Sequence, residues 1–116
     1  PGFTARRIGE EKMGPLTDRL MERLELLQKL LEQAGEEYWP ALLRQAAELI
    51  GKEDIGGVEN LLGLYGGMGS FSDLVLHPLN GHRVAEEDLD RVNRQLTELR
   101  SGVFRLARDI RHSYYS

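Results

Sequence analysis

The sequence contains no cysteine among its 116 residues. This absence excludes disulfide bonds, thiolate zinc sites and a cysteine nucleophile, and it fits a reducing compartment. No apolar run approaches the ~20 residues that a membrane-spanning helix requires. No segment combines the basic start, apolar centre and small-residue cleavage site of a secretory signal. We therefore expect a cytoplasmic protein with no membrane partner.

Positive charge is also scarce, because 15 Lys and Arg residues face 19 Asp and Glu residues, for a net charge of −4. Binding to a phosphate backbone requires a basic face, so the composition does not indicate a nucleic-acid partner. The length suits one domain with one core. The apolar fraction of 41% and charged fraction of 29% are ordinary for a globular chain.

The motifs of common enzymes and cofactor sites are missing. The glycine-rich stretch GGMG, residues 66–69, lacks a dinucleotide fingerprint, since Ser72 stands where the third glycine belongs and a helix precedes it. It lacks the Lys-Ser or Lys-Thr pair of a phosphate loop. Ser70 lies in MGSFS and not in the G-x-S-x-G of a nucleophile elbow. The sequence therefore predicts a non-enzymatic protein with no cofactor.

Helical periodicity is what the sequence has in abundance. The first helix is predicted to begin near Pro15 and to stop at Gly35. The second begins at about Pro40, which only a first turn tolerates, and ends at Gly51. A third, shorter helix is capped by Asp54.

The last helix, predicted over residues 86–110, has the longest apolar seam. Its members recur at spacings of three and four: Leu89, Val92, Leu96, Leu99, Val103, Leu106 and Ile110. We expect this seam to pack on the first helix, while a homodimer through the same helix stays open. Residues 111–116 are expected to fray, with docking of Tyr114 and Tyr115 as the alternative. The prediction is an all-α, single-domain four-helix arrangement with a glycine-rich loop before the last long helix.

The first twelve residues, PGFTARRIGEEK, carry no sustained period and precede Met13. We interpret residues 1–12 as an N-terminal extension that is non-native or read from an upstream start, or as a sign that the chain is a fragment. Residues 13–116 are then the helical domain.

The glycine-rich stretch continues into Ser70-Phe71-Ser72-Asp73, which predicts a capping box with Ser70 as the N-cap. Leu74 to Leu76 would follow as a short buried turn that Pro78 ends. One interpretation is a purely structural corner in which the glycines adopt positive φ. Another is an anion site made of exposed amides, although Asp73 already occupies the positive end of the turn. A third is a partner-binding loop.

Two further site hypotheses concern small groups of side chains. Asp73, His77 and His82 could form a mixed oxygen and nitrogen metal site, although Pro78 and Gly81 leave its geometry unset. Tyr38 and Trp39 could together form a recognition anchor, because Tyr and Trp are favoured at interface hot spots, although a single Trp at a helix start is more often a core residue. The residues predicted to bind a partner are Met68, Ser70, Phe71, Asp73, His77 and Trp39.

The stretch YGGMGSFSDLVL, from Tyr65 to Leu76, resembles the signature GGMGSxxDL of a small, uncharacterised bacterial family of helical proteins. The resemblance implies a compact bacterial protein that begins near Met13. It implies no activity and no catalytic residues.

These observations predict a non-enzymatic protein-interaction module, with an immunity-type inhibitor of a bacterial toxin as its most specific form. The acidic balance suits a basic, nucleic-acid-degrading protein partner, because opposite charge steers association. The alternative is a small-anion or metal-binding protein that uses the loop from Gly66 to Asp73 and the nearby histidines.

Overall fold

Four α-helices and three short 3-10 helices make up the computed structural model, which describes Ile8 and residues 10–116. The α-helices are α1 (Glu10–Gln33), α2 (Tyr38–Gly51), α3 (Ile55–Gly63) and α4 (Leu89–Tyr115). The 3-10 helices are η1 (Phe71–Asp73), η2 (Pro78–Asn80) and η3 (Glu86–Asp88). No strand occurs in this part of the chain. The predicted all-α fold with four helices is confirmed.

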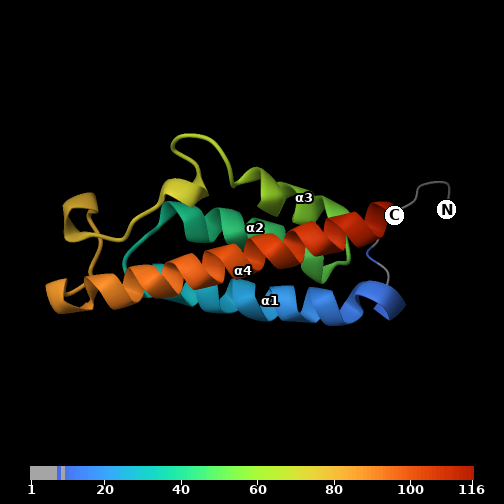
Figure 1. Ribbon diagram of the computed structural model, residues 1–116, viewed down its shortest axis with the longest axis horizontal. Helices are drawn as coiled ribbons and strands as arrows, with labels where there is room; N and C mark the ends of the chain where they lie inside the picture. The colour runs from blue at the N-terminus through green and yellow to red at the C-terminus, as the bar shows by residue number, and fades with distance from the viewer. Residues whose placement is uncertain (1–7, 9) are drawn as a thin grey trace.

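The helices form a closed ring in which α1 packs on α2, α2 on α3, α3 on α4 and α4 on α1. Figure 1 shows α1 and α4 side by side along the length of the molecule. The prediction that the last helix packs on the first within one chain is therefore confirmed. Because α3 has nine residues and α4 has 27, α3 covers only part of the length of α4. The segment between α3 and α4 covers the remainder (Figure 1).

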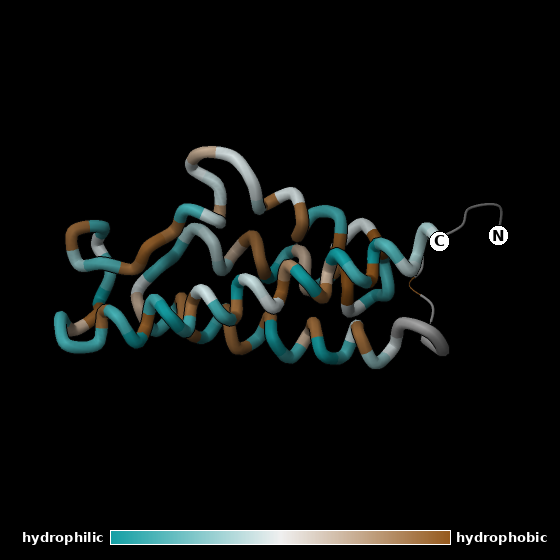
Figure 2. Tube along the Cα trace, viewed as in Figure 1, coloured by the Kyte–Doolittle hydropathy of each residue, from teal (hydrophilic) through white to brown (hydrophobic). Residues whose placement is uncertain are grey.

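The core follows from the apolar stripes of these helices. Hydrophobic residues recur between hydrophilic ones along α1 and α4 (Figure 2). In α1, Leu20, Leu24, Leu27 and Leu31 are each 0% exposed, and their spacings of four, three and four place them on one helical face. The buried members of α4 are Leu96, Val103, Leu106, Ala107 and Ile110. None of the helices in the described residues has the length and apolar character needed to cross a membrane.

The start of α1 and the end of α4 differ from the prediction. Helix α1 begins at Glu10, so Pro15 lies inside it. Pro15 is the sixth residue of α1, beyond the four N-terminal N–H groups that lack a partner, so its missing N–H removes one internal hydrogen bond. Helix α4 continues to Tyr115, so the expected fraying after Ile110 is wrong. Tertiary contacts explain the difference: Tyr114 packs against the core, and the Tyr115 hydroxyl lies 2.6 Å from Glu59 Oε2.

The folded body also reaches upstream of Met13. Ile8 is 3% exposed, and its backbone N–H donates to the carbonyl oxygen of Glu53 at 2.7 Å. The body therefore includes Ile8 and the first turn of α1, and the predicted boundary at Met13 lies within it. Most of the remaining predicted extension, residues 1–7 and 9, lies outside the described residues.

Helices α2 and α3 approach most closely at Gly57. A Cβ atom at this position would lie 2.7 Å from the carbonyl oxygen of Ala46 and 2.8 Å from the backbone nitrogen of Ile50. Both atoms belong to the backbone of α2, which cannot move aside as a side chain can. Gly63, at the other end of α3, has no atom within 4 Å of the same position.

We expect Gly57→Ala to lower the free energy of unfolding by about 1–3 kcal/mol, because the added methyl group pushes two helices apart. The control, Gly63→Ala, should change it by no more than about 0.5 kcal/mol. Urea unfolding followed by circular dichroism measures both. Equal stability of the two variants would contradict the close approach.

Candidate functional site

The segment from residue 64 to residue 88, called the connector below, contains no α-helix and no strand. Long ordered segments of this kind are frequently functional, because a scaffold can hold irregular backbone in a fixed shape. The connector contains the glycine-rich stretch. Its order depends on contacts within itself and with α1, α2 and α4.

Residues 66–73 form the glycine corner. Gly66, Gly67 and Gly69 have φ values of 88°, 81° and 77°, a region that other residues rarely adopt. Asp73 Oδ2 accepts a hydrogen bond from Gly69 N–H at 2.7 Å, and Ser72 Oγ accepts one from Gly66 N–H at 3.3 Å. The corner therefore closes on itself through its own side chains.

Ser70 is the N-cap, as predicted, but of the single 3-10 turn η1. Its hydroxyl accepts from Ser72 N–H at 3.3 Å. The capping box itself is wrong, because Asp73 bonds Gly69 N–H while Ser70 N–H donates to the carbonyl oxygen of Gly67. The expected buried turn after it is also wrong: Leu74 is extended, and Val75 is 52% exposed.

Arg100 of α4 holds the far side of the corner. Its Nη1 atom donates to the carbonyl oxygens of Phe71 and Leu74, both at 2.9 Å, and its guanidinium carbon lies 5.8 Å from the Phe71 ring centre. Burial lowers the pKa of Arg100. Tyr65 donates its hydroxyl hydrogen to the carbonyl oxygen of Arg100 at 2.7 Å, and burial raises the pKa of that hydroxyl, so it stays a donor. Arg100 thus satisfies the carbonyls that end η1.

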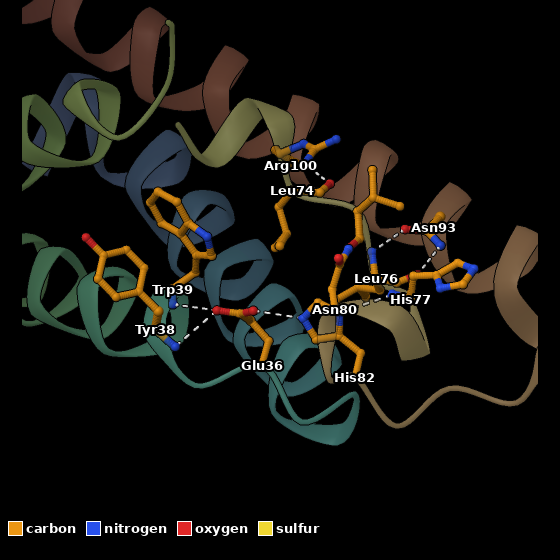
Figure 3. Close-up of polar contacts among 11 residues, drawn as sticks. Glu36, Tyr38, Trp39, Leu74, Leu76, His77, Asn80, His82, Asn93 and Arg100 are labelled. Atoms are coloured by element: carbon orange, nitrogen blue, oxygen red, sulfur yellow. Dashed lines mark hydrogen bonds and ion pairs between the residues drawn. The ribbon is translucent and has the colours of Figure 1, made fainter. Parts of the chain in front are cut away.

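Asn93, one heptad before Arg100, holds the next part of the connector. Its Oδ1 accepts from Leu76 N–H and its Nδ2 donates to the Leu76 carbonyl, both at 2.8 Å. This pair replaces the two bonds that a neighbouring strand would make. It allows Leu76 to be 0% exposed with both main-chain groups satisfied. Figure 3 shows Asn93 and Arg100 reaching the connector from one helix.

A third contact joins the connector to the turn between α1 and α2. Glu36 Oε2 accepts from the N–H groups of Tyr38 and Trp39, both at 3.0 Å, and Oε1 lies 2.9 Å from His82 Nε2 (Figure 3). His82 Nδ1 accepts from His77 N–H at 3.0 Å. Because Nδ1 is an acceptor, Nε2 carries the hydrogen that Glu36 receives.

The carboxylate of Glu36 is therefore needed in its charged form. Its side chain is 11% exposed and that of His82 is 5% exposed. Burial by itself raises the pKa of Glu36, but the hydrogen bonds from His82 and from the Trp39 and Tyr38 amides outweigh it. The net effect holds the pKa of Glu36 below its usual value.

A cleft of about 640 Å³ opens beside the glycine corner. Leu62, Tyr65 and Phe104 form an apolar wall, and Arg100 and Arg105 supply positive charge. The other lining residues are Gly66, Ser72 and Ser101. Since Gly66 and Ser72 belong to the corner, the corner and the cleft form one surface. Below, "the cleft" means these eight residues.

The residues predicted to bind a partner fall into two groups. Met68 is fully exposed at 101%, and Asp73 is also exposed. Phe71, in contrast, is 0% exposed, with its ring centre 5.1 Å from Trp39 and 5.5 Å from Tyr65. Phe71 therefore supports the corner from inside, and its predicted place on a binding surface is wrong. Trp39 packs partly buried against the core. Ser70 and His77 are half-buried.

The predicted metal ligands are not brought together. Asp73 is bonded to Gly69 N–H, His77 Nδ1 accepts from Leu79 N–H, and both ring nitrogens of His82 are engaged. Among the described residues there is no group of three or more His, Asp or Glu side chains that could hold a metal ion. The mixed site proposed from the sequence therefore lacks its ligand set.

Residues 32–85 match the family model of a domain of unknown function, DUF6966. The matched segment runs from the end of α1 through the connector and includes Glu36, the glycine corner and His82. The match agrees with the resemblance to a family without an assigned function. No curated protein and no solved structure matches the chain.

We expect Glu36→Gln to destabilise the protein by about 1–3 kcal/mol at pH 7. Both carboxylate oxygens of Glu36 accept hydrogen bonds, one from two backbone N–H groups and the other from His82. The amide of glutamine has only one oxygen, so it cannot accept all of these bonds. A pKa lowered by folding contributes stability above the usual value and loses it as pH falls through the lowered value. The difference between wild type and variant should therefore shrink below pH 4. Urea unfolding at pH 7 and pH 3.5 measures it, and a constant difference would contradict a charged Glu36.

We expect Arg100→Met to lower the free energy of unfolding by about 2 kcal/mol, because the carbonyls of Phe71 and Leu74 lose a charged donor. Amide hydrogen exchange at Leu74 and Gly69 should accelerate more than exchange in α1. Arg94→Met is the matched control on the same helix, because Arg94 is exposed, and it should change stability by no more than about 0.5 kcal/mol. Unchanged exchange at Leu74 would show that Arg100 does not hold the connector.

Proposed function

We propose that this protein is a non-enzymatic interaction module that binds one protein partner through the glycine corner and the cleft. The observation that carries the proposal is Met68, which is 101% exposed at the tip of a corner fixed by hydrogen bonds on both sides. A methionine in that position buries nothing within its own chain. Burial against another molecule accounts for an apolar side chain there.

The order of the corner favours binding. Asp73, Ser72 and Arg100 hold its backbone through the bonds described above. A partner therefore does not have to order this backbone on association, and that lowers the entropic cost of binding. The flexible thioether of Met68 can then adapt to the surface it meets.

The cleft supplies the complementary feature, a hollow with an aromatic wall. Tyr65, Phe104 and Leu62 can receive an apolar side chain of the partner. Tyr and Arg are enriched among the residues that dominate interface energies. Arg100 and Arg105 would face acidic or carbonyl groups at the edge of that contact. An exposed apolar side chain, Met68, beside the cleft suits contact with a protein surface better than binding of a small substrate.

The more specific form of the proposal is an immunity-type inhibitor of a bacterial toxin in the cytosol. Its support is the net charge of −4, which would attract a basic, nucleic-acid-degrading partner over distance. Arg100 and Arg105 of the cleft would repel a basic partner locally, so the attraction would come from the acidic side chains elsewhere on the molecule.

A small anion in the cleft is the second candidate. The amides of Gly66 and Gly69 are occupied by Ser72 and Asp73, so the loop is a poor anion site. Arg105 forms no ion pair among the described side chains and is the better candidate, whereas Arg100 already donates to two carbonyl oxygens and is within the influence of the Asp73 charge. A melting temperature raised by phosphate or sulfate in wild type, and not in Arg105→Met, would favour an anion over a protein.

We expect Met68→Glu to weaken partner binding at least tenfold, since a central contact residue contributes more than about 1.4 kcal/mol. The partner would be sought by co-purification with the products of neighbouring genes. Leu79→Glu is the matched control, because Leu79 is 90% exposed at another part of the connector. An equal loss of partner binding in both variants, or no loss of binding in either, would contradict binding through the corner.

The inhibitor form has its own test. Deletion of the gene should make cells vulnerable to sibling cells that carry the toxin, and the wild-type gene should restore protection. Cells that grow unharmed beside their siblings after deletion would contradict the inhibitor form. The interaction module would then still be tested by the binding of the Met68→Glu variant.

A further inference from the structure

A second hollow lies between α1 and α4, away from the connector. It is a groove of about 780 Å³ that runs from Arg19 to Gln33 on α1 and from Gln95 to Asp109 on α4. The groove spans 15 residues of each helix, which is roughly 21 Å, or about four helical turns. The groove therefore has the length of a short docked helix.

Four leucines lie in the groove among polar side chains. Leu26 is 44% exposed, and Leu30, Leu99 and Leu106 lie along the same groove. Gly102 lies between them in the middle of α4, where glycine disfavours a helix relative to alanine. No atom lies within 4 Å of the position of a Cβ atom on Gly102. Packing within this chain thus does not require glycine there, whereas close approach of another backbone does.

The rim of the groove is basic, although the chain as a whole is acidic. Arg19, Arg23, Lys29 and Arg105 line it, against only Glu98 and Asp109. Among the described side chains, Arg19, Arg23 and Arg105 form no ion pair. Lys29 pairs with Glu25 at 3.7 Å, and the three arginines still outnumber Glu98 and Asp109 along the groove of a chain whose net charge is −4.

We propose that the α1–α4 groove is a docking site for an acidic amphipathic helix of another protein. Such a helix would lay its apolar face over Leu26, Leu99 and Gly102 and place its carboxylates beside Arg19, Arg23 and Arg105. It would complete an ordinary helix-in-groove contact on the side of the molecule that α2 and α3 do not cover. A second copy of this chain fits less well, because it would bring the same positive rim against itself.

The direct test uses a fluorescein-labelled synthetic peptide of four helical turns, with leucine at helical spacing and glutamate on the flanks. Fluorescence anisotropy with the full chain should show saturable binding that weakens as salt rises. The same peptide with lysine in place of glutamate should bind at least tenfold more weakly. Equal binding of the two peptides, or no saturable binding of either, would overturn the proposal.

Three variants locate the site. Arg23→Glu should weaken binding of the acidic peptide roughly tenfold, because it reverses one charge on the rim. Gly102→Leu should abolish binding by filling the floor, and its circular dichroism spectrum should remain that of wild type. Arg94→Glu, an exposed charge reversal on α4 outside the groove, should leave binding within about twofold. Loss in all three variants would mean nonspecific electrostatics and would overturn the site.

Two further measurements separate this proposal from the others. Met68→Glu should leave binding of the acidic peptide unchanged, so the groove can fail or succeed independently of the glycine corner. Sedimentation equilibrium should show a monomer. A dimer that Gly102→Leu dissociates would show that a second copy occupies the groove, and that result would overturn the proposed partner.

Discussion

The mismatch in length between α3 and α4 is the constraint on which the structure depends. A helix of nine residues cannot cover one of 27, so irregular backbone must fill the rest of the fourth side of the bundle. Buried backbone groups need hydrogen-bond partners, and irregular backbone does not supply them regularly. Arg100 and Asn93 supply them directly, and the His82 ring, which Glu36 holds, accepts from His77 N–H. The connector is therefore a part of the core that side chains, and not backbone ladders, hold in shape.

This arrangement gives the glycine corner its potential for function. A corner closed by Asp73 and Ser72 and held by Arg100 presents Met68 in a fixed position. The same residue, Arg100, lines the cleft, so one side chain both orders the surface and contributes to it. The groove between α1 and α4 is a separate surface, linked to the cleft only through Arg105, which lines both. Helix α4 lines both surfaces, and its side chains also hold the connector.

The residues that order the connector were not recognised from the sequence, although one signal was present. Asn93 and Arg100 lie seven residues apart, so they share a face of α4 next to its apolar seam. Polar residues with that spacing beside a seam indicate a buried polar contact as well as a solvated face. Periodicity cannot decide between these, because it does not show which segment passes over the helix. Glu36 carried less signal, since an acidic residue at a helix start is ordinary.

Local patterns by themselves determined the four helices, the Asp54 cap and the place of Pro40 in a first turn, because each depends on neighbours a few residues away in the chain. The tertiary structure alone decided that Phe71 is core, that Asp73 turns back to Gly69, and that His77 and His82 serve hydrogen bonds and not a metal. It also decided that α4 stays helical to Tyr115. The burial of Phe71, the Glu36–His82 contact and the end of α4 depend on residues far apart in sequence. The Asp73–Gly69 and His77–His82 bonds join residues four and five apart, and they depend on a backbone shape that the packed bundle fixes.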